Sequence, residues 1–572
     1  MSSAVSHPQQ VASPRLTTID GTPLSIEHVF EIGKGDRSLK VSRDQAKLER
    51  IAAAVELVDE AVNQEWPVYG VTTGFGGMAN QPVPCAQAAA SQNNLLSFLA
   101  TGAGPAISRR HVRAAMALRA NVLMQGYSGV RLEIIQRLVR FVNVDATPVV
   151  RELGSIGASG DLVPLSTIAR AITGQNRYTR VDWNGREIDG IAALEALDLA
   201  PLELRPKEGL AIVNGTSFSA AIAANCVAES HRLMALALGA QAIMLRALQA
   251  QDQPFDAFVH ERKPHPGQVW SAQIIDRLLN EGCDMIGGGV PAHPGSEPVQ
   301  DRYSIRCLPQ YMGPIVEGLA RIARVVEVEM NAVSDNPLID AENERFYQSG
   351  NFLGQYVGIA MDDLRRFLGL MAKHLDVQIA SMVTPAFSNG LPSSLRGNDE
   401  LAYNMGLKGL QITGNSIMPM LTYMGNPIVE HFPTHAEQFN QNINGLSWGA
   451  GNLAWKSVEL FQHYLSVALI CAVQAIDLRA KATLGHYDGR ALLGTLLVPL
   501  YEAVSAAADV ELGAEQPFLL NDSDQWMEHQ LAALQENISS HGTIVDAVAP
   551  VLASFDQQLF SEQPPVSRHE HL

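Results

Sequence analysis

The chain has 572 residues, 47% of them apolar and 17% charged, which is the balance of a globular protein with a large core rather than of a disordered chain. Its formal net charge of −18 at pH 7 argues against nucleic acid and against an anionic membrane as its main partner. The five cysteines are scattered without a Cys-x-x-Cys pair, and no stretch has the character of a signal peptide or a membrane span, so we expect a cytoplasmic protein.

The N-terminal part of the chain predicts helices after a short tail. We expect residues 1–20 to form a disordered tail. The segment SRDQAKLERIAAAVELVDEAVNQ at 42–64 repeats apolar residues at helical spacing, and Ser42 and Gln45 have the spacing of a capping box. Ser108 is a second helix start signal, ahead of RRHVRAAMALRANVLM.

Helical patterns dominate the rest of the chain. Four of them are unusually long, which favours a helix bundle or a subunit interface; they cover approximately 216–252, 311–335, 351–383 and 435–480. The short segment RYTRVDWNG at 177–185 is consistent with a small hairpin. We therefore expect an all-α protein in consecutive parts: an N-terminal domain over 21–215, a central long-helix bundle domain over 216–480, a C-terminal helical region over 481–560 and a disordered tail over 561–572.

Two long loops interrupt the helical pattern, one at 67–84 and one at 281–306. Both are rich in glycine and proline, and long loops of this kind inside a helical protein are more often functional lids than idle spacers. Tyr69 and Tyr303 stand near the ends of these loops. For a single tyrosine, packing alone is the simpler interpretation.

A third unusual segment, GSIGASGDLVP at 154–164, places glycine and serine between apolar stretches. It is not a nucleophile elbow, because Gly160 follows Ser159 directly and breaks the Gly-x-Ser-x-Gly register. The chain also has no P-loop or dinucleotide-binding glycine motif. His431 and His435 have Pro433 between them and lack the glutamate of a zinc motif, so we expect no metal site.

The tripeptide Ala158-Ser159-Gly160 has the residues that a backbone cyclisation needs. Attack of the Gly160 nitrogen on the Ala158 carbonyl closes a five-membered ring with loss of one water. Loss of the Ser159 hydroxyl as a second water then leaves an exocyclic methylene, which gives 4-methylideneimidazol-5-one. Glycine leaves the attacking nitrogen accessible and permits the strained turn, and Asp161 is placed to help move protons.

Ordered blocks along the chain resemble the aromatic amino acid ammonia-lyases and aminomutases, and most of all the bacterial phenylalanine ammonia-lyases. The blocks include YGVTTGFGGMAN, GSIGASGDLVPLS, KEGLAIVNGT, KPHPGQ, QDRYSIRCLPQ, SDNPLID, GNFLGQYV, GLKGLQI and HAEQFNQNIN, and they span about residues 20 to 500. The resemblance implies an all-α homotetramer whose four active sites are each built from three subunits. It also implies that the N-terminal domain carries the electrophile formed from Ala158, Ser159 and Gly160, with no external cofactor.

The resemblance further implies roles for individual residues. Tyr69 matches the catalytic base. Free tyrosine titrates near ~10, so we expect positive potential, for example from helix N-termini, to lower the pKa of Tyr69. Tyr303 matches a second functional tyrosine, and Arg306 should bind the substrate carboxylate through its planar fork. Asn214 matches a contact to the prosthetic group, and Asn336 a contact near the substrate carboxylate, although Asn336 before Pro337 is also a plain helix stop.

The other matching positions surround the amine and the aromatic ring of the substrate. Polar matches are Gln300, Glu437, Asn440 and Gln441, and ring-pocket matches are Leu95, Leu210, Phe352, Lys408 and Ile412. The spacing of Glu437, Asn440 and Gln441 would place all three on one helix face, a pattern that also describes a solvated face.

Substrate choice depends on Phe98 and Leu99 in NNLLSFLATG. They match the family's selectivity pair, and an apolar pair leaves a phenol without a hydrogen-bond partner, so we expect phenylalanine as the aromatic L-amino acid. One departure is GLSWG after NQNIN, where Trp448 either reshapes the pocket or packs at an interface.

Three alternatives remain open at this stage. A phenylalanine aminomutase uses the same residues but returns the ammonia to the β-carbon. A tyrosine or histidine ammonia-lyase would differ only in its substrate, and a non-catalytic helical tetramer would keep the fold alone. The sequence also does not decide whether the electrophile captures the amine or the aromatic ring.

Overall fold

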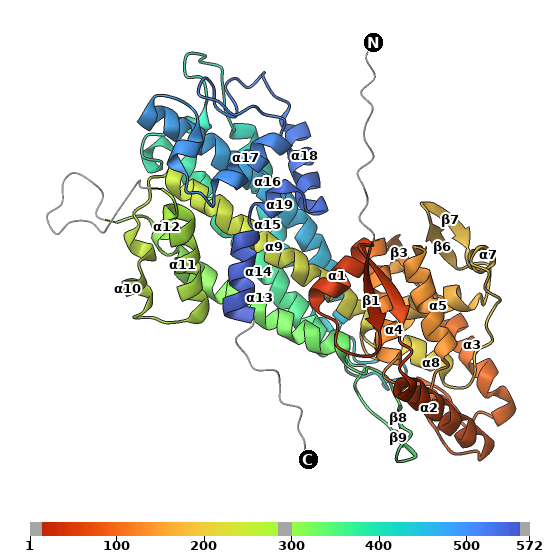
Figure 1. The fold of residues 1–572 in the computed structure, drawn as a ribbon. Coiled ribbons are helices and arrows are strands. Elements are labelled where there is room, and N and C mark those ends of the chain that lie inside the picture. The colour runs from red at the N-terminus through yellow and green to blue at the C-terminus, as the bar shows by residue number, and fades with distance from the viewer. Residues whose placement is uncertain (1–13, 284–299, 561–572) are drawn as a thin grey trace, which may run out of the picture. The chain divides into compact units, whose positions relative to one another are not determined.

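The computed structural model describes residues 14–283 and 300–560 (Figure 1). Helices dominate these residues, and the strands form only small sheets of two or three strands, so the expected all-α class is confirmed. The expected tail at 561–572 and most of the expected loop at 281–306 lie outside the described residues.

The described residues form two compact units, and each unit is assembled from separated stretches of chain. The first unit contains the described residues up to Asn225 together with Val325–Ile359 and Ile428–Asn452. The second contains Cys226–Arg324, Ala360–Pro427 and the described residues from Leu453 onward. This arrangement differs from the expected division into consecutive domains, because each of the four long helices contains a boundary between the units.

The described part of the first unit begins with a strand inside the tail expected at 1–20, whose residues 1–13 lie outside the described residues. Strand β1 (Arg15–Ile19) pairs in parallel with β2 (Arg37–Val41). Thr17 and Ile19 alternate into the core, with exposed fractions of 8% and 0%. The expectation of a disordered tail is therefore wrong from residue 15 onward, because β-branched residues at alternate positions provide a buried strand face.

The helix expected at 42–64 is α2 (Gln45–Asn63), but its cap differs from the prediction. The Asp44 side chain accepts the hydrogen bond from the Lys47 backbone N–H over 3.2 Å. Ser42 instead accepts from the Asp44 N–H. Aspartate caps a helix as well as serine does, so Asp44, which is nearer to the helix, is the N-cap residue.

The remaining elements of the first unit lie on either side of the glycine-rich segment 154–161. The hairpin expected at 177–185 exists as β6 (Arg180–Trp183) and β7 (Arg186–Asp189), with β4 (Ala146–Pro148) as a third strand. The helices are α1 (Ile26–Lys34), α3 (Ala88–Phe98), α4 (Arg109–Leu123), α5 (Leu132–Asn143), α6 (Leu162–Thr173), α7 (Gly190–Ala196) and α8 (Glu208–Val213), and the strands are β3 (Ala103–Ala106), β4 (Ala146–Pro148), β5 (Arg151–Leu153), β6 (Arg180–Trp183), β7 (Arg186–Asp189), β8 (Leu338–Asp340) and β9 (Arg345–Tyr347).

The four long helices are α9 (Ser217–Ala247), α13 (Leu308–Asn331), α14 (Gln355–Met382) and α16 (Ser447–Leu484). In the second unit their side chains interlock: Gln241 of α9 lies 2.6 Å from the His374 ring nitrogen of α14, and the Tyr464 hydroxyl of α16 donates to Asp376 of α14 over 3.1 Å. The ring of Tyr311 on α13 stacks on His374 with 4.7 Å between centroids. The expected bundle of long helices is therefore confirmed.

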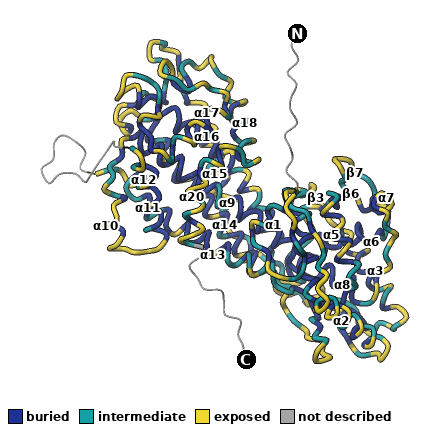
Figure 2. Tube along the Cα trace, in the orientation of Figure 1, coloured by how far each residue is buried: buried dark blue, intermediate teal, exposed yellow. Residues whose placement is uncertain are grey.

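The other helices of the second unit are shorter. They are α10 (Ala257–His260), α11 (Pro266–Asn280), α12 (Tyr303–Arg306), α15 (Lys408–Met424), α17 (Val498–Ala507), α18 (Met527–Ser540), α19 (Thr543–Asp546) and α20 (Ala549–Phe555). Figure 2 shows α9 and α16 dark blue along most of their length. Glu208–Ala247 is the one helical stretch of the described residues that is long and apolar enough to cross a membrane, and its most apolar window is entirely buried inside the structure.

The last long helix begins later than the sequence pattern predicts. Residues 435–446 are not helical, and α16 starts at Ser447. Glu437, Gln438 and Phe439 have φ angles of 51°, 55° and 67°, which an α-helix cannot contain. The asparagines and the glycine of the same segment favour turns, and this preference outweighs the helical propensity of its alanine, glutamate and glutamines.

Candidate active site

The segment 154–161 is a tight turn between β5 and α6. Gly160 has a φ of +69°, and a Cβ atom added there would lie 2.3 Å from the Gly215 carbonyl oxygen. Gly157 has a φ of +64°, and its added Cβ would lie 2.4 Å from the Ser447 hydroxyl. These glycines therefore allow the backbone of the turn to pack closely against Gly215 and Ser447, and these contacts fix the conformation of the turn.

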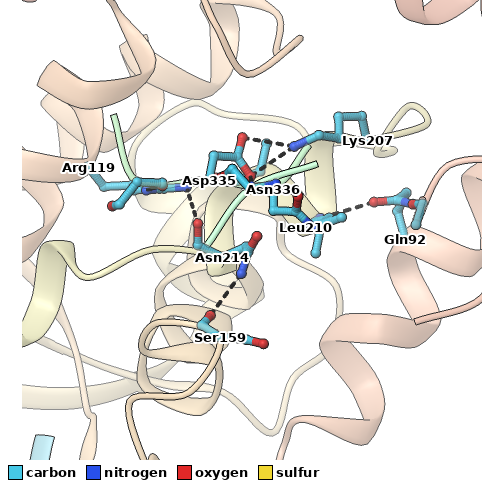
Figure 3. A network of polar contacts seen from close by, with 12 residues as sticks. Gln92, Arg119, Ser159, Lys207, Leu210, Asn214, Asp335 and Asn336 are labelled. Atoms are coloured by element: carbon cyan, nitrogen blue, oxygen red, sulfur yellow. Dashed lines mark hydrogen bonds and ion pairs between the residues drawn. The ribbon is translucent and has the colours of Figure 1, made fainter. Parts of the chain in front are cut away.

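Hydrogen bonds hold the tripeptide from two sides. The Asn214 side-chain amide donates to the Ser159 carbonyl oxygen over 2.9 Å (Figure 3). The Gln441 side-chain amide donates to the Ser159 hydroxyl over 3.0 Å. The Asp161 N–H donates to the Gly215 carbonyl over 2.8 Å. The structure thus brings Asn214 and Gln441, both expected from the sequence, directly to Ser159.

The surroundings of the tripeptide fit a ring closure between Ala158 and Gly160. Ala158 is 4% exposed, so bulk water has little access to its carbonyl environment. Asp161 is fully buried, one carboxylate oxygen accepts from the Ser219 N–H over 2.7 Å, and the other has no hydrogen-bond partner among the described residues. Burial raises the pKa of Asp161 to about 7. A carboxyl group that titrates near neutral pH can both take and return a proton.

A cavity of about 500 Å³ opens beside Ser159. Eight of the residues expected from the sequence line it. They are Tyr69, Leu95, Phe98, Ser159, Leu210, Asn214, Glu437 and Gln441.

The loop at 67–84 forms one wall of this cavity, through Tyr69, Gly74–Met78 and Gln81–Val83. The loop contains the short 3-10 helix η1 (Gly76–Met78), and a second, η2 (Cys85–Gln87), follows directly after it. An added Cβ at Gly76 would lie 2.5 Å from a Glu437 carboxylate oxygen. The glycines of the loop therefore let its backbone approach Glu437, so that the loop and Glu437 line the same cavity.

The electrostatic environment of Tyr69 is opposite to the expected one. The Gly76 N–H donates to the Tyr69 hydroxyl oxygen over 3.0 Å. Burial raises the pKa of Tyr69, and the negative charge of Glu437 raises it further, while the hydrogen bond from Gly76 lowers it. Within this chain the pKa of Tyr69 is therefore raised and not lowered, because desolvation and a nearby carboxylate both disfavour the phenolate.

The apolar wall comes from α3 and α8. Leu95 and Phe98 of α3 line the cavity together with Leu210 of α8. Leu99 is 7% exposed and is not among the lining residues. Of the expected pair, Phe98 therefore lines the cavity and Leu99 does not, because consecutive residues at a helix end point in different directions.

Sequence reasoning missed several lining residues. Ser91 and Asn94 share one face of α3 with Leu95 and Phe98, at the i, i+3, i+4 and i+7 positions. Helical spacing from Phe98 could have identified them. The other lining residues that were not named individually are Leu162 and Gln438, together with Gly74–Met78 and Gln81–Val83 of the loop that was expected as a whole.

Trp448 does not line the cavity. It is 1% exposed, its indole N–H donates to the Glu152 carbonyl over 2.5 Å, and its ring meets the Phe218 ring edge-on with 4.9 Å between centroids. Trp448 therefore packs in the core of the first unit and does not reshape the pocket.

Eight expected site residues other than Ala158, Gly160 and Leu99 are not among the lining residues of this cavity. Asn336, Phe352 and Asn440 belong to the first unit, where the Asn336 side-chain oxygen accepts from the Ser349 N–H over 2.7 Å. The other five belong to the second unit and are Gln300, Tyr303, Arg306, Lys408 and Ile412.

The helix α12 carries Tyr303 and Arg306 side by side. The Arg306 guanidinium lies 4.5 Å from the centre of the Tyr303 ring, and its Nε donates to the Asp301 carbonyl over 2.8 Å. Tyr303 is 72% exposed and Ile412 is 64% exposed. Across residues 14–283 and 300–560, no group of three or more His, Cys, Asp or Glu side chains is placed to hold a metal ion.

Comparison with known proteins gives the family. Residues 24–497 match the model of the aromatic amino acid lyases. The chain is 47% identical to a phenylalanine ammonia-lyase of Nostoc punctiforme over 95% of this chain and 96% of that protein, and 42% identical to an aromatic ammonia-lyase of Loktanella atrilutea over 94% and 99%. A tyrosine aminomutase structure from Streptomyces globisporus superposes with a TM-score of 0.82 at 25% identity, covering 96% of this chain and 99% of that one. This chain belongs to the aromatic amino acid lyase family.

Proposed function

We propose that this protein converts L-phenylalanine to trans-cinnamate and ammonia without oxidation. The observation that carries the proposal is the cavity in which Ser159, Tyr69 and Glu437 share one space with an apolar wall. The tight turn at Ala158–Gly160 supports formation of 4-methylideneimidazol-5-one from the chain's own residues. Once formed, that group supplies an electrophilic methylidene carbon that makes the substrate's amine leave as ammonia.

Tyr69 acts as the base in this proposal. Its phenolate oxygen takes the proton from the substrate's β-carbon. The free chain disfavours the phenolate, but the ammonium group of a bound amino acid brings positive charge next to Glu437 and Tyr69. That charge offsets the carboxylate and favours ionisation of Tyr69 when substrate is present.

The apolar wall selects the side chain of the substrate. Leu95, Phe98 and Leu210 bury the aromatic ring and offer no hydrogen-bond partner. A phenol buried against them loses its hydrogen bonds to water, so phenylalanine is preferred over tyrosine.

We further propose that the protein is a homotetramer and that neighbouring subunits complete each site. The exposure of Tyr303 and Ile412 supports this, because large apolar or aromatic side chains at a surface favour an interface. Arg306 would then bind the substrate carboxylate through its terminal nitrogens, with Gln300 and Lys408 nearby as further contributions. Asn336, Phe352 and Asn440 are proposed to complete the contacts to the substrate.

We also propose a cytoplasmic location, and the five cysteines support it because all of them are free. The acidic composition supports a small-molecule substrate rather than nucleic acid.

The test of the proposed activity is incubation with L-phenylalanine while cinnamate absorbance is followed. Chiral product analysis of the same mixture separates the lyase from an aminomutase, which would accumulate β-phenylalanine. L-tyrosine and L-histidine are assayed in parallel. Formation of cinnamate as the main product supports the proposal, whereas turnover of only tyrosine or histidine, or no turnover at all, overturns it.

A further inference from the structure

On the side of Asn214 that faces away from Ser159 lies a completely buried arginine, Arg119 of α4 (Figure 3). Burial lowers its pKa to about 10, which leaves it protonated at neutral pH. Its guanidinium binds backbone carbonyls: Nη1 donates to Ser334 over 3.0 Å, and Nη2 donates to Asn214 over 3.3 Å and also to Ala211. The guanidinium therefore donates hydrogen bonds to three carbonyl oxygens of the main chain.

Two of these carbonyls belong to the end of α8, next to the turn that contains Gly215. A Cβ added at Gly215 would lie 2.3 Å from Arg119 Nη1 and 2.6 Å from the Ser334 carbonyl oxygen. Only glycine lets the guanidinium come this close. The position of the Arg119 guanidinium therefore depends on the absence of a side chain at Gly215, directly after α8.

The same turn holds the tripeptide on its other side. The Asn214 side-chain amide donates to the Ser159 carbonyl over 2.9 Å, and the Gly215 carbonyl accepts from the Asp161 N–H over 2.8 Å. Ser159 and Asp161 are therefore bound by two consecutive residues, Asn214 and Gly215, and Arg119 binds the main chain of Asn214. A shift of the Asn214–Gly215 turn would change both hydrogen bonds.

A second buried cation anchors the opposite end of α8. Lys207 Nζ lies 2.8 and 2.9 Å from the two Asp335 carboxylate oxygens, and both side chains are fully buried. Asp335 follows Ser334 in the chain, so Lys207 and Arg119 tie the two ends of α8 to the same segment. Only Arg119 also contacts the residue that reaches Ser159.

We propose that Arg119 is a positioning residue for the self-modification of the chain. Its fork binds the main-chain carbonyl of Asn214. It thereby fixes the position of the Asn214 side chain and of the Gly215 carbonyl, so that the Gly160 nitrogen faces the Ala158 carbonyl carbon. In the closure, the bond between these two atoms forms, and the carbonyl oxygen leaves as water with the protons of the Gly160 and Ser159 amide nitrogens, which leaves a double bond between the Ala158 carbon and the Ser159 nitrogen. Ser159 then loses its hydroxyl and its α-proton as a second water, which leaves the exocyclic methylene. The inference rests on the proposed function and concerns how the electrophile is formed and held.

The test compares Arg119→Lys with the wild type. Lysine keeps the positive charge, but its single ammonium cannot span three carbonyls, so the fraction of chains that lack two waters at the peptide containing Ser159 should fall by about fivefold or more. For the chains that are modified, kcat should fall by about tenfold with KM nearly unchanged, because the loss concerns orientation and not substrate contact. Peptide mass spectrometry measures the first effect without any substrate.

Arg479→Lys is the matched control. Arg479 is also a buried arginine that donates to backbone carbonyls, those of Ala247, Ser388 and Asn389, but it belongs to the second unit. This control should show a comparable drop in melting temperature and complete modification. If Arg119→Lys does not fold, Gly215→Ala serves instead, because it displaces the fork while Arg119 remains.

The outcomes separate the two proposals. A wild-type chain without the two-water loss overturns the proposed function. A fully modified wild type together with a folded Arg119→Lys or Gly215→Ala variant that is fully modified and has wild-type kcat overturns the role of Arg119. Equal loss of modification in Arg479→Lys also overturns it, because the effect would then follow from lost stability alone.

Discussion

The side-chain amide of Gln441 donates a hydrogen bond to the hydroxyl of Ser159 over 3.0 Å. These two residues are far apart in the chain, and the contact places the segment 435–446 over the tripeptide. The hydroxyl that the proposed modification removes is therefore already oriented by a neutral donor, which stabilises the oxygen as it leaves.

Ser159→Ala should abolish turnover without unfolding the protein. Alanine has no hydroxyl to lose, so no methylidene group can form, while the backbone turn depends on the glycines and on Asn214. The mass of the peptide containing residue 159 should show no loss of the second water, and the melting temperature should stay near that of the wild type. Substantial cinnamate formation by Ser159→Ala would contradict the proposed electrophile.

Tyr69→Phe should lower kcat by several orders of magnitude, of the size expected for the loss of a general base. The ring still fills its place beside the loop, so folding and KM should change little. Steady-state kinetics with L-phenylalanine measures both constants. Near-wild-type activity would mean that another group takes the proton, with Tyr303 the next candidate.

The rising limb of the pH profile of kcat/KM should respond to Glu437. Burial and then Glu437 raise the pKa of Tyr69, and the base works only when it is deprotonated, so kcat/KM should rise with pH through the neutral range. Glu437→Gln removes the negative charge and thus lowers the pKa of Tyr69. The rising limb should therefore move to lower pH, even though the rate at its plateau falls. A limb that stays in place or moves upward would show that Tyr69 does not titrate in this step.

Phe98→His should shift selectivity toward tyrosine. The imidazole offers a hydrogen-bond partner where the Phe98 ring offers none, and burying a bare phenol costs roughly 1–3 kcal/mol, which corresponds to about five- to 150-fold in selectivity. Values of kcat/KM for phenylalanine and tyrosine on both proteins measure the change. Leu99→Val is the control, because Leu99 is buried away from the cavity and its truncation should leave the ratio unchanged.

Trp448→Phe should reduce stability without changing substrate preference. The substitution removes the hydrogen bond to the Glu152 carbonyl and part of the contact with Phe218, a loss of roughly 1–3 kcal/mol in the free energy of unfolding. Thermal or denaturant unfolding measures the loss, and the ratio of phenylalanine to tyrosine turnover checks the pocket. A changed ratio would show that Trp448 influences the cavity from the core.

Local patterns in the sequence were sufficient for much of the fold. The helical repeats at 216–252, 311–335 and 351–383 correspond to α9, α13 and α14, because an amphipathic or apolar repeat of sufficient length forms a helix in most settings. These helices depend on residues close together in the chain, so the sequence alone determined them. Eight residues of the cavity were also named from the sequence, but through the tripeptide at 158–160 and the resemblance to the aromatic amino acid ammonia-lyases.

The tertiary structure decided what depends on distant neighbours. Glu437, Gln438 and Phe439 adopt left-handed conformations in a segment whose Glu437 side chain lies against Gly76 and whose backbone lies against Gly77, and no local pattern predicts that contact. Burial depends on packing in the same way: it raises the pKa of Tyr69 and places Trp448 in the core. Short-range propensities carry no information about which surfaces meet, and for that reason the turn at 437–439 and the electrostatics of Tyr69 required the folded chain.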